Sequence, residues 1–302
     1  MTLRTVLTHD SEASLNWLNA ILIPPSLLQP TRMPDSTHSF APTIARFSGF
    51  AGDYDRHRAQ PPAALAALLS QLAGTGQAEL VVDLGSGTGL STRYWAERAR
   101  RVVGVEPSAD MRAEALRQTH AANVEYRDGY AHATGLSDRC AQIVTCMQAL
   151  HWMDPLASFT EARRILVPGG VFAAIDYDWP PVTRSWRADQ AWHSCSERAA
   201  RLETTLAGSR PPRWDKAGHL ARMQGSGCFR FTRECVLHHV DEGDAERFVG
   251  LLRCQGGVMD LLKAGHTEDE LGIGELDGIA RAELGSEARP WYWSARVRIG
   301  VV

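Results

Sequence analysis

Short apolar runs alternate with helical or loop segments through the middle of the chain. Five such runs are rich in β-forming residues and occupy residues 78–85, 99–107, 124–129, 141–148 and 169–177. Strands that alternate with helices typically form a parallel sheet with helices on both faces. The pattern therefore predicts an α/β fold built on a Rossmann-like, doubly wound and mostly parallel sheet.

The pattern changes after the fifth run. Residues 184–222 are polar and helix-like, and residues 244–284 are helix-like with glycine breaks. Residues 229–240 alternate as a strand does, and residues 291–302 form a last apolar run. We expect seven strands in all, with helical insertions after the fifth strand and between the last two strands.

The N-terminal 40 residues differ from the rest of the chain. They show no sustained periodicity and are rich in Pro, Ser and Thr, which is typical of a poorly ordered leader. The segment that begins at Met33 reads like a natural start. We therefore expect either that the protein begins at Met33 or that residues 1–32 are dispensable, and that residues 41–302 form a single domain.

Composition restricts the class of partner. The chain has 302 residues, of which 44% are hydrophobic, and its 32 basic and 35 acidic residues leave a net charge of −3 without long single-sign blocks. This favours a small-molecule partner over nucleic acid or a membrane surface. No apolar run approaches the roughly 18 residues of a membrane span. The six cysteines include no Cys-x-x-Cys pair, so we expect no metal site and reduced thiols in a cytoplasmic protein.

A glycine-rich turn, Gly85-Ser86-Gly87-Thr88-Gly89, lies between the first predicted strand and a helix. Glycine lets the main chain turn sharply and approach a ligand, and the helix N-terminus offers free N–H groups to an anionic part of that ligand. The nicotinamide fingerprint places its third glycine where this chain has Leu90, which disfavours a nicotinamide-dependent oxidoreductase. Glu106, which follows the second strand, can accept hydrogen bonds from both hydroxyls of a ribose.

Further candidate ligands follow the third and fourth strands. Tyr130 and the main chain of Ala131 are expected beside an adenine ring, although Tyr130 also fits a surface aromatic residue. Gln148, His151 and Trp152 follow the fourth strand, at the edge where ligands of open α/β sheets bind. A nucleoside-bearing cofactor is the expected ligand of this edge.

Taken in order, the motifs "DLGSGTG", "VEPSADM", "DGYAHATGL", "QALHW" and "LVPGG" resemble the class I S-adenosylmethionine-dependent methyltransferases. The resemblance is to the group called methyltransferase type 11 or trans-aconitate methyltransferase-like, and it is strong over residues 46–180. It implies an antiparallel last strand and S-adenosyl-L-methionine as the cofactor. It divides the chain into an N-terminal cap at 41–76, a cofactor core at 77–180 and substrate-side insertions at 184–222 and 244–284.

The resemblance also implies roles for individual residues. Asp83 would support the amino end of the methionine part, Glu106 would hold the ribose, and Met111 would pack on the adenine. Many relatives have Gly-Asp-Ala-Glu where this chain has Gly129-Tyr130-Ala131-His132, so the Ala131 main chain is the better-supported adenine contact. The expected cofactor-binding set is Asp83, Gly85, Ser86, Gly87, Gly89, Glu106, Met111, Gly129, Tyr130, Ala131 and Gln148.

The N-terminal cap and the end of the fifth strand are expected to complete the site. Tyr54 matches a position that covers the sulfonium, and Arg58 matches one that meets a carboxylate; both also fit ordinary packing. The acceptor is expected near Trp152 and Tyr177. Other residues expected to line the acceptor pocket are Asp176, Asp178, Trp179, Trp186 and Trp192.

The expected reaction is transfer of a methyl group to a small molecule, more readily to oxygen than to carbon or nitrogen. A hydroxyl acceptor would benefit from a general base, and His151 is the best-placed candidate, although it also fits the pocket floor. The alternative is a cofactor-binding protein that has lost catalysis and acts through a partner. We expect a monomer or a homodimer.

Overall fold

The computed structural model describes Ile44, residues 51–204 and residues 213–302. The contacts divide the chain into two units, of which Phe40–Val302 contains all of these residues. The predictions for the 40-residue leader lie outside the described residues. Everything below concerns the second unit.

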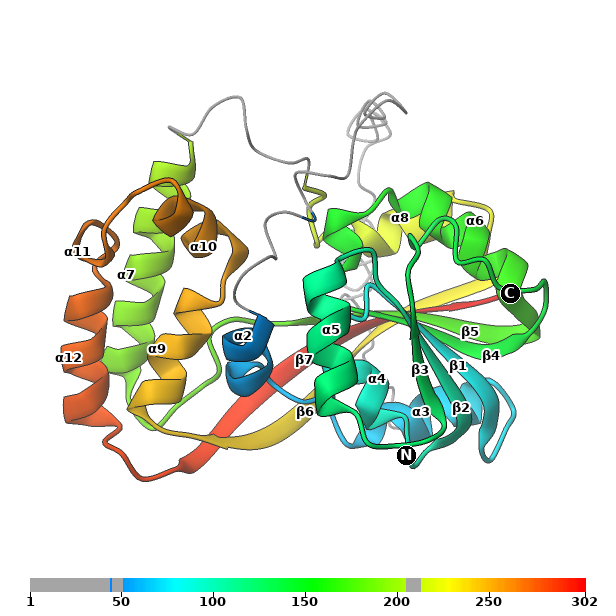
Figure 1. The fold of residues 1–302 in the computed structure, drawn as a ribbon, viewed down its shortest axis with the longest axis horizontal. Helices are drawn as coiled ribbons and strands as arrows, with labels where there is room; N and C mark the ends of the chain where they lie inside the picture. The colour runs from blue at the N-terminus through cyan, green and yellow to red at the C-terminus, as the bar shows by residue number, and fades with distance from the viewer. Residues whose placement is uncertain (1–43, 45–50, 205–212) are drawn as a thin grey trace, which may run out of the picture. The chain divides into compact units, whose positions relative to one another are not determined.

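A seven-stranded sheet forms the centre of this unit, in the order β3-β2-β1-β4-β5-β7-β6 (Figure 1). The first five strands pair in parallel, whereas β7 is antiparallel to both β5 and β6. The predicted doubly wound sheet with an antiparallel last strand is therefore confirmed. The strands are β1 (Ala78–Leu84), β2 (Ala99–Val105), β3 (Val124–Arg127), β4 (Ala141–Met147), β5 (Leu166–Tyr177), β6 (Phe231–Gly243) and β7 (Arg289–Val301).

Burial of the strands follows their place in the sheet. Residues Leu80–Leu84 of the central strand β1 are buried without a break, because helices cover both faces. In the edge strand β6, exposed and partly buried residues largely alternate. The burial patterns of β1 and β6 therefore reflect their central and edge positions in the sheet.

The helices of the parallel half include two that begin at good capping residues. The Ser108 side chain accepts a hydrogen bond from the Met111 N–H at the start of α5, and Asp154 does the same for Ala157 at the start of α6. These helices cover the sheet and leave the carboxyl ends of β1, β2 and β4 accessible. They are α2 (Ala51–His57), α3 (Ala64–Leu72), α4 (Leu90–Tyr94), α5 (Ala109–Gln118), the short 3-10 helix η2 (Leu150–Trp152) and α6 (Pro155–Ile165).

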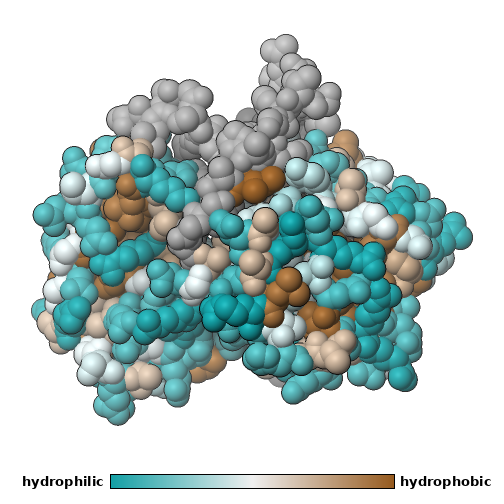
Figure 2. All heavy atoms as spheres, in the orientation of Figure 1, coloured by the Kyte–Doolittle hydropathy of each residue, from teal (hydrophilic) through white to brown (hydrophobic). Residues whose placement is uncertain are grey.

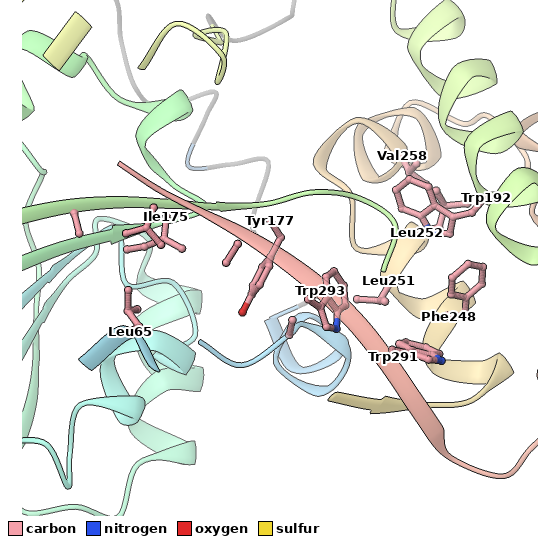
Figure 3. Close-up of a cluster of buried hydrophobic side chains, with 14 of the residues drawn as sticks. Leu65, Ile175, Tyr177, Trp192, Phe248, Leu251, Leu252, Val258, Trp291 and Trp293 are labelled. Atoms are coloured by element: carbon pink, nitrogen blue, oxygen red, sulfur yellow. The ribbon is translucent and has the colours of Figure 1, made fainter. Parts of the chain in front are cut away.

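The helical insertions lie where the sequence predicts them, after β5 and between β6 and β7. Aromatic side chains from both insertions and from β7 share a buried cluster, in which Figure 3 shows Trp192, Phe248 and Trp291. The inserted helices are α7 (Trp186–Glu203), α8 (His219–Gly225), α9 (Ala245–Arg253), α10 (Gly256–Lys263), α11 (Glu268–Leu271) and α12 (Ile273–Glu283).

The visible surface and the cysteine thiols give no further indication of the function. On the face that Figure 2 shows, apolar residues lie in separate small groups among hydrophilic ones. Within the described ranges, no helix is long and apolar enough to cross a membrane. The six cysteines are free thiols, and Cys146, Cys195, Cys228 and Cys254 are buried.

Candidate active site

Two adjoining cavities lie at the carboxyl ends of the parallel strands. The first has a volume of about 1130 Å³, including its open mouth, and loops that follow β1, β2, β3 and β4 all contribute to it. Residues far apart in the sequence meet here because parallel strands end at one edge of the sheet. The lining includes Tyr54, Arg58, Gly85, Ser86, Gly87, Glu106, Met111, Tyr130, Ala131, Gln148, Trp152 and Tyr177.

The glycine turn between β1 and α4 requires glycine for two reasons. Gly85, Gly87 and Gly89 all have positive φ angles, of 67°, 54° and 84°, which side chains disfavour. A Cβ at Gly85 would overlap the Met153 side chain and lie 2.8 Å from Ala149 Cβ. A Cβ at Gly87 would meet no atom of the described residues within 4 Å. The main chain of Gly87 is therefore bare on the side that a ligand can approach.

Asp83 lies beneath this turn and does not line the cavity. Its carboxylate accepts hydrogen bonds from the hydroxyls of Ser91 (2.5 Å), Thr92 (2.8 Å) and Thr145 (2.9 Å). Burial raises the pKa of Asp83, and these three hydrogen bonds oppose the shift. Asp83 thus ties the start of α4 to β4 and supports the turn from below.

Glu106 lines the first cavity immediately after β2. Its carboxylate accepts hydrogen bonds from the main-chain N–H groups of Gly87 (3.0 Å) and Ser108 (2.9 Å). Burial raises the pKa of Glu106, and the hydrogen bonds from Ser108 and Gly87 oppose the shift. Each carboxylate oxygen can accept a further hydrogen bond, so Glu106 remains able to bind ligand hydroxyls.

The loop after β3 brings Tyr130 and Ala131 to the same cavity. Ala131 is buried, whereas Tyr130 is 40% exposed and its ring stacks on His132 at a centroid distance of 5.4 Å. Met111 reaches the cavity from α5 and is buried. Gly129 belongs to this loop but does not line the cavity.

The second cavity shares a wall with the first and has a volume of about 980 Å³, including open space. Six residues line both cavities, so a ligand in one can touch a ligand in the other. These six are Tyr54, Arg58, Gln148, Trp152, Tyr177 and Trp179. The second cavity is also lined by His151, Trp192, Glu203, Arg213 and Lys216.

Gln148 lies where the two cavities meet. Its φ angle of 53° is unusual for a residue other than glycine. Its side-chain oxygen accepts a hydrogen bond from Lys216 Nζ (2.7 Å). Its buried Nε2 has no hydrogen-bond partner among the described residues and is left to donate to a ligand.

His151 is 4% exposed, and its Nδ1 lies 3.9 Å from Asp176 Oδ1, too far for a hydrogen bond. Burial, followed by the charges of Lys216 and Arg213, holds the pKa of His151 well below 6.5. His151 is therefore neutral at physiological pH. The same cations would make an imidazolium ion at this position unfavourable.

Two predicted pocket residues have structural contacts as well. The Tyr177 hydroxyl donates a hydrogen bond to the main-chain oxygen of Gln60, which ties β5 to the segment before α3. The Arg58 guanidinium lies 4.4 Å from the Tyr54 ring centroid and 4.8 Å from that of Trp179. Trp186 is 70% exposed and lines neither cavity.

Lys216 and Glu203 were not singled out in the sequence. Both belong to the insertion after β5, and no local motif marks them. The only sequence signal for Lys216 is rarity, because Lys216 and Lys263 are the only two lysines of the chain. Their place in the second cavity follows from the packing of that insertion.

Acidification below pH 6.5 is expected to lower the free energy of unfolding. Burial lowers the pKa of His219 to about 4 from 6.5, although Asp176 opposes the shift. The unfolded chain takes up a proton at this histidine from about pH 6.5 downward, whereas the folded chain does not, so stability falls until about pH 4. Urea titrations between these pH values measure the free energy of unfolding. This free energy should change less with pH in His219→Asn than in the wild type. In the exposed control His120→Gln it should change with pH as it does in the wild type. Equal slopes for His219→Asn and the wild type would contradict this assignment.

Comparisons with known proteins agree with the fold and the motifs. A methyltransferase-domain family model matches residues 82–174. The malonyl-[acyl-carrier protein] O-methyltransferase of Enterobacter lignolyticus is 33% identical over 220 residues, which cover 70% of this chain and 85% of that protein. An uncharacterized methyltransferase of Mycobacterium tuberculosis is 37% identical over 125 residues, 41% of this chain and 49% of that protein.

A solved structure supports the fold. A putative type II methyltransferase from Anaeromyxobacter dehalogenans has a TM-score of 0.54 and 24% identity, and the match covers 81% of this chain and 97% of that chain. The protein belongs to the class I S-adenosylmethionine-dependent methyltransferases. The predicted resemblance is thus confirmed. The match spans about half the length of the first curated relatives, including the mycobacterial protein.

Proposed function

We propose that this protein transfers a methyl group from S-adenosyl-L-methionine to an oxygen atom of a small molecule. One observation carries the proposal. Of the eleven predicted cofactor residues, eight line the first cavity, and Gly89 belongs to the glycine turn beside it. The two exceptions are Asp83 and Gly129. A cofactor bound there would lie against the second cavity, where an acceptor fits.

The residues of the first cavity fit this cofactor. The bare main chain of Gly87 admits a close approach, and the buried hydroxyls of Ser86 and Thr88 have no hydrogen-bond partner among the described residues. Glu106 would hold the ribose hydroxyls, and Met111 with the Ala131 main chain would flank the adenine. Arg58, which lines both cavities, would meet the carboxylate of the methionine part.

When bound, the cofactor supplies an activated methyl group for direct displacement. The protein must then align the acceptor and exclude water. Trp152 and Tyr177, which line both cavities, would hold the acceptor against the cofactor. We assign His151 to the floor of the second cavity, because nearby cations oppose the charge that a general base acquires. This assignment suits an acceptor oxygen that is ionised before it binds.

We propose oxygen as the methylated atom because of the reaction named for one relative. The curated protein of Enterobacter lignolyticus that is similar over 220 residues is named as an O-methyltransferase. We extend this reaction class to the present chain, with a small-molecule acceptor. Family membership also favours S-adenosyl-L-methionine over the nicotinamide alternative.

Titration with S-adenosylhomocysteine tests the proposal. We expect the wild-type protein to bind S-adenosylhomocysteine but not NAD in isothermal titration calorimetry. Glu106→Ala should weaken binding about tenfold to 100-fold, because hydrogen bonds to a charged group contribute about 1.5–3 kcal/mol. The control Glu79→Ala removes an exposed carboxylate of β1 and should bind as the wild type does. Binding of NAD in place of S-adenosylhomocysteine would overturn the proposal.

A further inference from the structure

The second cavity has an excess of positive charge. Among the described residues that line it, Arg58, Arg213 and Lys216 are basic and only Glu203 is acidic. Asp176 lies outside the lining and offsets one of these cations, because its carboxylate is 3.0 Å from Lys216 Nζ. Before the cofactor binds, a net positive charge remains among the described residues of the wall, with His151 neutral. A cavity of this charge favours an anionic ligand.

The groups at one end of this cavity are hydrogen-bond donors. Lys216 Nζ donates to Gln148 Oε1 and contacts Asp176, and an ammonium group has a third hydrogen to donate. The Gln148 Nε2 group is buried and has no hydrogen-bond partner among the described residues. Lys216 and Gln148 are therefore adjacent, and each has a donor to spare. A carboxylate, which only accepts hydrogen bonds, matches this pair.

Lys216 is held in place by Asp176 of strand β5, which is itself paired with strand β7. Asp176, at the end of β5, also binds Arg298 Nη1 of β7 at 2.9 Å. Both Asp176 and Arg298 are buried. The Lys216 ammonium group is thus fixed at the cavity wall by a rigid part of the fold, which is what recognition of a small anion requires.

The rest of the wall is aromatic. Trp152, Trp179 and Trp192 line the cavity, and the rings of Trp179 and Trp192 are nearly parallel, with an interplanar angle of 10° and centroids 6.3 Å apart. Arg213 lies over the Trp152 ring, 5.3 Å from its centroid, so its positive charge is close to this aromatic surface. Such a wall suits a flat apolar body.

We propose that the methyl acceptor is a flat apolar molecule that carries a carboxylate, which Lys216 and Gln148 bind while the tryptophans hold the apolar body. Arg213 adds positive charge to the same cavity. The inference rests on the proposed function, since it assigns the acceptor of the same site. Glu203 lies in the same cavity and disfavours ligands with several negative charges.

Matched pairs of ligands test this proposal. The probes are benzoate, cinnamate, 1-naphthoate and indole-3-acetate, each paired with its primary amide. Their dissociation constants are measured by calorimetry, with and without saturating S-adenosylhomocysteine. In the wild type, at least one carboxylate should bind tenfold or more tightly than its amide. Lys216→Gln should reduce this preference to less than threefold.

Two further variants control the experiment. Lys263→Gln makes the same change at the only other lysine, which is exposed on α10, and should keep the wild-type preference. Arg213→Gln reduces the positive charge without touching Asp176 and should weaken carboxylates more than amides. Circular dichroism shows whether each variant folds.

The two proposals fail in different ways. If S-adenosylhomocysteine binds but no wild-type pair shows a tenfold preference, the carboxylate proposal is overturned and the proposed function stands. The same holds if folded Lys216→Gln and Arg213→Gln both keep the full preference. If carboxylates are preferred but S-adenosylhomocysteine does not bind, the methyltransferase proposal fails instead.

Discussion

Gly85→Ala is expected to weaken binding of S-adenosylhomocysteine at least 100-fold. The new Cβ would overlap the Met153 side chain and approach Ala149 Cβ to 2.8 Å, at a φ angle of 67° that L side chains rarely adopt. The main chain of the turn must then move, and with it Gly85, Ser86 and Gly87, which line the first cavity. Calorimetric titration with S-adenosylhomocysteine measures the loss.

Two other glycines separate a local binding effect from misfolding. Gly87→Ala creates no contact within 4 Å in the part of the chain that the structure describes, so it should destabilise the fold less than Gly85→Ala and still weaken binding. Gly76→Ala places a methyl group in open space away from the turn and should bind as the wild type does. Wild-type affinity in folded Gly85→Ala would show that the first cavity does not hold the cofactor.

Asp83→Ala is expected to lower the free energy of unfolding by about 3 kcal/mol, since buried polar groups that lose their partner cost about 1–3 kcal/mol and the missing volume adds to the loss. The hydroxyls of Ser91, Thr92 and Thr145, which all belong to buried residues, would lose their acceptor. Urea unfolding monitored by circular dichroism measures the change. Binding of S-adenosylhomocysteine should weaken as well, because the glycine turn loses its support.

The matched control for this change is Asp138→Ala. Asp138 has a side chain that is 75% exposed and pairs with Arg164. An exposed ion pair contributes about 0–1 kcal/mol, so this variant should stay near the wild type. Asp83→Asn keeps one acceptor oxygen and should lie between the two. A loss below about 1 kcal/mol in Asp83→Ala would mean that the three hydroxyls find other partners.

The fold and the first cavity were largely predictable because their signals are local. The apolar runs predict strands such as β1 and β2, and the alternation of strands with helices predicts their parallel pairing. The glycine turn and Glu106 each directly follow a predicted strand. Since parallel strands end at the same edge, residues at those ends had to meet. That reasoning does not depend on the details of packing.

The sequence by itself determined the family, the sheet and the ligand-facing turns, because strand periodicity, glycine turns and short motifs act over a few residues. Only the tertiary structure decided the second cavity. It brought Lys216 to Asp176 and Gln148, placed Trp192 in the wall, and left Trp186 exposed although both tryptophans belong to α7. Such contacts depend on how the inserted helices pack against β5 and β7, and no local pattern in the sequence encodes that packing.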